Sequence, residues 1–141
     1  MEYRMTPLWQ LSATDQAAGI RDGSFTSAAV VESVLERVAQ KNPELNAIVD
    51  PMEEQALLAS EKADNAVASG RKLGLLHGVP VTIKVNVDTK GRPTTNGMEA
   101  FKDVIAPDNS PIVQNLLNAG AIIVGRTNTP EMSMRLTTDN P

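Results

Sequence analysis

The sequence contains no cysteine and very few aromatic residues. Without cysteine, a disulfide, a thiolate nucleophile and a cysteine-ligated metal site are all excluded. Histidine occurs once, at His77, so a cluster of histidine ligands is excluded too, and we expect neither a metal site nor a cofactor. With aromatic residues at 3%, the hydrophobic core must consist of alanine, valine, leucine and isoleucine.

Long hydrophobic runs and an excess of positive charge are also missing. No apolar stretch approaches the length of a membrane span, and Met1–Arg4 lead into no apolar segment like that of a signal peptide. The formal net charge of −4 argues against a nucleic-acid-binding surface. We therefore expect a cytoplasmic protein without membrane or nucleic-acid partners. Its 141 residues, 41% of them hydrophobic, fit one globular domain.

The first part of the chain carries the signals of two helices. Ser12 is a candidate N-cap, and Gly23 can end the helix that follows it. Thr26 can cap a second helix, which we expect to end at Asn42-Pro43. The second helix has an apolar stripe with helical spacing, formed by Val31, Val34, Leu35 and Val38.

A strand and a third helix are predicted next. Residues 46–50 are a short strand candidate. Asp50 can cap the third helix, with Pro51 at its first position and Gly70 just beyond its end. The alanines of this helix allow close packing against a neighbour.

The stretch 79–88 alternates apolar and polar residues, which predicts a strand with two unlike faces. After an irregular segment at 98–109, Ser110-Pro111 predicts the start of a helix that Gly120 closes. The apolar run 121–124 predicts a strand buried on both faces, so that strand, helix and strand form a βαβ unit. One more helix is expected to open at 129–131. The apolar face of the strand predicted at 79–88 consists of Val79, Val81, Ile83, Val85 and Val87.

Lys84 lies on the polar face of the strand predicted at 79–88. One interpretation is an ordinary solvated lysine, which is the usual state of this residue type. The other is that the polar face lines a closed site, where desolvation favours a neutral lysine that can act as a base. The alternation alone does not decide between them.

Four blocks of sequence, in this order and spacing, resemble the amidase signature family over nearly the whole chain. They are Leu76-His77-Gly78-Val79-Pro80-Val81-Thr82-Ile83-Lys84, Gly91-Arg92-Pro93-Thr94-Thr95-Asn96-Gly97, Ala119-Gly120-Ala121-Ile122-Ile123-Val124-Gly125-Arg126-Thr127-Asn128 followed by Pro130-Glu131, and Thr138-Asp139-Asn140-Pro141. The resemblance implies an α/β fold in which amino-terminal helices precede a partial mixed or parallel sheet with flanking helices.

The resemblance also implies a mechanism and site residues. Family members use a serine nucleophile, a bridging serine on a cis peptide bond and a lysine, and Lys84 matches that lysine. Thr129 and Met132 lie where the family places the wall of its site, although helix capping and packing would explain them equally well. The sequence departs from the family pattern at Val85, where aspartate is usual, at Met98, where serine is usual, and at Arg126, where lysine is common.

Neither catalytic serine is present, because none of the serines lies in a Gly/Ser-rich stretch. We expect residues 1–141 to be the amino-terminal part of a single amidase domain that stops before the nucleophile segment, and to be inactive alone. The complete protein would hydrolyse small carboxamides. The alternatives are a component of a tRNA-dependent amidotransferase and a non-catalytic protein that acts by assembly. A partial sheet has open edges, so we expect a homo-oligomer.

Overall fold

The computed structural model describes residues 6–140. The start of the chain, Met1–Arg4, and Pro141, which ends the last motif block, lie outside the described residues. The described helices and strands are α1 (Ala13–Asp22), α2 (Ser27–Leu45), β1 (Ile48–Pro51), α3 (Glu53–Ala68), β2 (Pro80–Lys84), α4 (Pro111–Asn118) and β3 (Ile122–Thr127), with short 3-10 turns η1 (Leu8–Gln10), η2 (Glu99–Phe101) and η3 (Glu131–Ser133).

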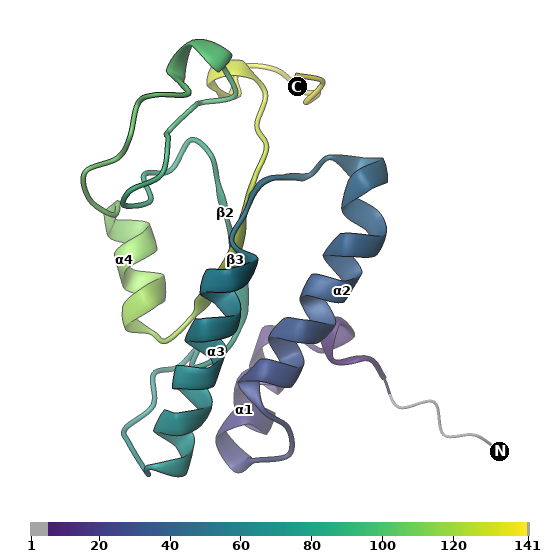
Figure 1. Cartoon of the computed structure of the whole chain (residues 1–141), viewed down its shortest axis with the longest axis vertical. Helices are drawn as coiled ribbons and strands as arrows, with labels where there is room; N and C mark the ends of the chain where they lie inside the picture. Colours follow the sequence, from purple (N-terminus) through teal and green to yellow (C-terminus); the bar gives the residue numbers. More distant parts are fainter. Residues whose placement is uncertain (1–5, 141) are drawn as a thin grey trace, which may run out of the picture.

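A mixed three-stranded sheet with helices on both faces forms the centre of the molecule (Figure 1). The strand order is β1-β3-β2, and β3 runs antiparallel to β1 and parallel to β2. Helices α2 and α3 cover one face, and α4, which connects the two parallel strands, covers the other. This arrangement confirms the predicted α/β fold and its βαβ unit.

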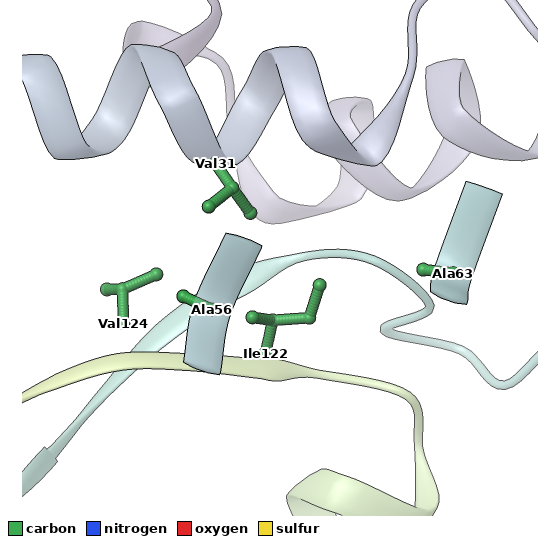
Figure 2. Close-up of a cluster of buried hydrophobic side chains, with 5 residues drawn as sticks. All are labelled: Val31, Ala56, Ala63, Ile122 and Val124. Carbon is green, nitrogen blue, oxygen red and sulfur yellow. The ribbon is translucent and has the colours of Figure 1, made fainter. Parts of the chain in front are cut away.

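One face of β3 is buried under α2 and α3. Ile122 and Val124 of β3 pack with Val31 of α2 and with Ala56 and Ala63 of α3 (Figure 2). Ala56 is fully buried, so its small side chain lets α3 approach the sheet closely, as the alanine content predicted. Burying each larger aliphatic side chain contributes about 1.5–3 kcal/mol, and this cluster therefore holds the two helices on the sheet.

The other face of the sheet packs on α4. Ile83 of β2 and Ile123 of β3 meet Val113 of α4, which is fully buried. Because Ile122 and Ile123 point to opposite faces, β3 is buried on both, as its continuous apolar run predicted. The strand that precedes Lys84 is thus fixed by packing as well as by its hydrogen bonds to β3.

Three predicted helix starts are confirmed by side-chain caps. Ser12 accepts a hydrogen bond from the Asp15 amide (3.1 Å). Thr26 caps α2 in the same way, and Ser110 caps α4 with Pro111 in the first turn. Such caps typically contribute about 1 kcal/mol each.

Helix α2 runs past Asn42-Pro43 to Leu45, so its predicted end is wrong. Proline in the last turn removes only one backbone donor, and the Asn46 amide still bonds to the Asn42 carbonyl at 2.7 Å. The helix ends where Asn46 adopts a left-handed conformation (φ 48°). The Asn42 side chain then holds both the amide and the carbonyl of Ile48 at 2.8 Å.

The prediction that Asp50 caps α3 is also wrong. Asp50 and Pro51 belong to β1, and the residue that precedes α3, Met52, makes no side-chain cap. The Asp50 carboxylate cannot serve the helix because it pairs with Arg92, at 2.8 Å. Glu53 and Glu54 occupy the first turn of α3, where their negative charges interact favourably with the positive end of the helix dipole.

Several boundaries differ from prediction around the carboxyl ends of the parallel strands. Strand β2 ends at Lys84 instead of continuing to residue 88, and β3 extends to Thr127. The helix expected at 129–131 is only the turn η3, because Met132 and Ser133 have positive φ angles that an α-helix does not accommodate. The irregular segment 98–109 contains η2.

Strands β1 and β2 are the two edges of the described sheet. Open edges are templates for pairing between copies of a chain, so self-association stays a prediction that sedimentation at high micromolar concentration would test. Among residues 6–140, no helix has the length and apolar character needed to cross a membrane.

Candidate active site

Lys84 is the last residue of β2 and pairs with Thr127 of the parallel strand β3. The chain then turns at once, with the Val85 amide bonded to the Thr127 carbonyl (2.9 Å) and the Val87 amide bonded to the Lys84 carbonyl (3.0 Å). Lys84 is exposed, and within residues 6–140 its ammonium group enters no hydrogen bond or ion pair. It therefore stands free at the carboxyl end of parallel strands, where open α/β sheets commonly form their sites.

A chain of polar side chains links the turn after Lys84 to the segment after β3. The Asn86 amide group donates to Ser133 Oγ (3.1 Å), and Ser133 Oγ lies 3.0 Å from Thr129 Oγ1. The Asn86 Oδ1 atom is buried and has no partner among the described residues. Sequence reasoning missed Asn86 and Ser133, since nothing in their local patterns distinguishes them from loop residues.

The two residues predicted to line the site differ in exposure. Thr129 is fully buried, and its hydroxyl is occupied by Ser133. Met132 is 46% exposed and has φ 53°, the left-handed region that non-glycine residues rarely adopt. Its amide donates to the Asn96 carbonyl (2.9 Å), which helps to hold this conformation. Neither residue lines the pocket described below, so their predicted place in the wall of the site stays a prediction.

The last three motif blocks meet around Asn140. Its amide group donates to the Gly97 carbonyl (2.6 Å) and to the Thr129 carbonyl (3.0 Å). Its Oδ1 accepts a hydrogen bond from Asn128 (2.9 Å), whose own Oδ1 accepts one from the Thr129 amide. Blocks that lie far apart in the sequence are therefore joined into one wall by two asparagines.

Gly97 offers a test of this junction. It has φ +74°, and a Cβ there would collide with the Thr129 carbonyl, whereas Gly91 has φ +75° with open space around it. We expect Gly91→Ala to cost about 1–2 kcal/mol through backbone strain alone. Gly97→Ala should cost about 3 kcal/mol, because the collision adds to that strain. Urea unfolding of the two variants measures the difference, and equal losses would contradict the close approach.

Beside the lysine lies an open pocket of about 940 Å³. It is lined by Val85 but not by Lys84, so the lysine stands at the side of this pocket and does not project into it. The three positions at which the sequence departs from the family pattern, Val85, Met98 and Arg126, all line it.

The electrostatic centre of this region is an ion-pair cluster. Asp50 of β1 lies 2.8 Å from Arg92 and 3.5 Å from Arg126. Burial of the guanidinium lowers the pKa of Arg126 below its ordinary value, and the Asp50 carboxylate partly offsets this effect. Sequence reasoning noted Arg126 only as a departure and assigned Asp50 to a helix cap, because a pairing across 76 residues leaves no local pattern.

None of the eight serines forms a hydrogen bond with Lys84, and each has a structural partner in the described part of the chain. Ser27 Oγ, for example, donates to the Gly78 carbonyl (2.8 Å), which ties α2 to the segment before β2. The His77 ring likewise lies 2.9 Å from the Ala63 carbonyl and joins this segment to α3. The described residues thus supply a candidate base and the wall of a site, with no hydroxyl placed against the base. The serines are Ser12, Ser24, Ser27, Ser33, Ser60, Ser69, Ser110 and Ser133.

Comparison with known proteins decides the family. A sequence model of the amidase family matches residues 29–141. The chain belongs to the amidase signature family. It is 54% identical over 135 residues to the indoleacetamide hydrolase of Bradyrhizobium diazoefficiens, a match that covers 96% of this chain and 26% of that enzyme.

Other amidase relatives are similar over a comparable region. The acylamidase of Rhodococcus erythropolis is 40% identical (92% of this chain, 27% of that protein). A glutamyl-tRNA(Gln) amidotransferase component from Natranaerobius thermophilus is 36% identical (94% and 27%). The structure of a bacterial aryl acylamidase of the amidase signature family superposes with a TM-score of 0.88 at 28% identity (96% of this chain, 28% of that one). This chain spans about a quarter of the length of its curated relatives.

Proposed function

We propose that this chain supplies the general base of an amide hydrolase, and that Lys84 is that base. The observation that carries the proposal is the position of Lys84: a lysine without a side-chain partner among residues 6–140, at the carboxyl end of a parallel strand and next to the wall on which the motif blocks meet. Membership of the amidase signature family supports the same role.

The proposed reaction needs two serines from outside residues 1–141. A neutral Lys84 accepts, through the bridging serine, the proton of the nucleophilic serine as its oxygen attacks the amide carbon. The lysine then returns the proton to the departing amine or ammonia as the C–N bond breaks, which leaves an acyl-enzyme. Water hydrolyses the ester by the same proton route and releases the acid, while backbone N–H groups stabilise each oxyanion.

The names of the relatives support a substrate class. The first relative is named an indoleacetamide hydrolase and the second an acylamidase. Small carboxamides with an apolar acyl group are therefore the proposed substrates. Val85 and Met98 contribute apolar side chains to the pocket that lies beside Lys84, which supports a place for an apolar acyl group there.

The test is a comparison of two proteins. The isolated chain should hydrolyse no amide, because it lacks a hydroxyl placed against Lys84. A hybrid, in which residues 1–141 replace the matching part of the Bradyrhizobium indoleacetamide hydrolase, should hydrolyse indole-3-acetamide and simpler aryl acetamides. Chromatography that quantifies the released product measures the activity of both proteins. Turnover by the isolated chain, or a folded hybrid without activity, would contradict the proposal.

A second candidate function is that of a component of a tRNA-dependent amidotransferase, which the Natranaerobius relative favours. Such a protein would release ammonia from glutamine and would require partner proteins. The identity to the indoleacetamide hydrolase is higher, 54% against 36%, and supports the hydrolase. Glutamine included in the same assay separates the two functions, since an amidotransferase component would prefer it to aryl acetamides.

A further inference from the structure

Arg126 is the only charged side chain that is fully buried among the described residues. Removing a guanidinium from water is costly unless hydrogen bonds and a counter-ion replace its hydration. The two Nη atoms meet this requirement with one carboxylate, Asp50, and three backbone carbonyls, while the buried Nε has no partner among the described residues. Most of its hydrogen-bonding capacity is therefore directed at the main chain.

Two of these carbonyls belong to the turn that follows Lys84. Arg126 Nη2 donates to the Val87 carbonyl (3.2 Å) and to the Val85 carbonyl (3.4 Å), and Nη1 donates to the Pro93 carbonyl (2.6 Å). Val85 and Val87 lie beyond the end of β2, so their carbonyl oxygens have no neighbouring strand to pair with. The guanidinium of Arg126 thus supplies the hydrogen-bond donors that a neighbouring strand would otherwise provide.

The amides of the same turn form hydrogen bonds with backbone carbonyls. The Val85 amide bonds to the Thr127 carbonyl and the Val87 amide bonds to the Lys84 carbonyl. The amides and carbonyls of both Val85 and Val87 are therefore engaged, and these bonds fix the backbone from Lys84 to Val87. The direction in which the Lys84 side chain leaves the sheet depends on the path of this backbone.

We propose that Arg126 is a positioning residue for Lys84: its guanidinium fixes the turn 84–87 and so places the lysine for proton transfer. The proposal rests on the proposed role of Lys84 as the base. A lysine at position 126 would offer a single ammonium in place of a planar group with five donors, and could not reach these carbonyls and Asp50 together.

A rival explanation is that Arg126 serves only as a partner for Asp50. Arg92 distinguishes the two, because it also pairs with Asp50 but makes no hydrogen bond to the turn after Lys84. Arg92→Met is therefore the matched control for Arg126→Met.

The first experiment measures amide hydrogen exchange in the 141-residue chain. In Arg126→Met, exchange at Val85 and Val87 should accelerate about tenfold or more relative to the amides of α4, since the turn opens locally. In Arg126→Lys, we expect a smaller but selective acceleration, and in Arg92→Met none. Unchanged exchange at both amides in a folded Arg126→Met, or an equal change in Arg92→Met, would overturn the proposal. If Arg126→Met does not fold, Arg126→Lys becomes the deciding variant. A uniform acceleration of exchange in Arg126→Lys, or no acceleration at Val85 and Val87, would then overturn the proposal.

The second experiment uses the hybrid enzyme. Arg126→Met should lower kcat about a hundredfold with little change in KM, since misplacing a catalytic group by about 1 Å has effects of that size. Arg126→Lys should recover part of this loss. Full kcat in Arg126→Met, in a hybrid that depends on Lys84, would overturn the positioning role alone. A hybrid that does not need Lys84 would instead overturn the proposed function, whatever the exchange data show.

Discussion

Replacing Lys84 by alanine in the hybrid enzyme is expected to lower kcat about 10⁴-fold or more. The serine hydroxyl is too weak an acid to attack an amide unaided, and the single histidine, His77, cannot take the place of Lys84 because its ring is bound to α3 through the Ala63 carbonyl. Members of a catalytic triad act as a unit, so the loss of one removes most of the acceleration. Steady-state kinetics with an aryl acetamide measures the effect.

The matched control for this variant is Lys90→Ala. Lys90 is exposed, and its ammonium pairs with Asp108 across 3.5 Å at the surface. We expect its loss to leave kcat and KM within about twofold, because exposed ion pairs contribute little. If Lys84→Ala kept the rate of the unaltered hybrid, Lys84 would not be the base.

The second large effect is expected for stability. Asp50→Asn keeps the shape of the side chain but removes the carboxylate shared by Arg92 and the fully buried Arg126. Removing one partner of a buried ion pair strands the other, and we expect a loss of about 3 kcal/mol, near the low end of the usual range because Asp50 is 21% exposed. Urea unfolding of the isolated chain measures it.

Asp108→Asn is the control for this stability effect. Its ion pair with Lys90 is exposed on both sides, so we expect a loss below about 0.5 kcal/mol. Similar losses in the two variants would show that the Asp50 cluster behaves as an ordinary surface ion pair.

Most of the fold could be predicted because its determinants are local. Ser12, Thr26 and Ser110 cap helices through bonds that span three residues, so a short stretch of sequence contains the whole interaction. The alternation before Lys84 and the apolar run of β3 predicted one strand with unlike faces and one strand buried on both.

The errors arose where a long-range contact outweighed a local preference. Asp50 had the sequence context of a helix cap, but Arg92 and Arg126, far along the chain, hold its carboxylate. Likewise, Thr129-Pro130-Glu131 predicted a helix start. The bond from the Met132 amide to the Asn96 carbonyl and the positive φ at Met132 instead end the turn after three residues.

The candidate site was predictable only in part, for the same reason. The family resemblance assigned a role to Lys84, but which side chains surround it depends on how the motif blocks meet. The links through Asn86, Ser133 and Asn140 join segments 11 to 47 residues apart and leave no pattern in the sequence. The same holds for Val85, Met98 and Arg126, which are scattered along the chain and line one pocket.

The central claim is that this chain contributes the base and that the nucleophile comes from elsewhere. The most direct measurement is peptide mapping of the hybrid enzyme after reaction with a serine-directed fluorophosphonate. We predict that the label lies on a serine outside residues 1–141, and that Lys84→Ala slows labelling at least about a hundredfold, because the base no longer activates that serine. A label on a serine within residues 1–141, or labelling at the same rate in Lys84→Ala, would contradict the account.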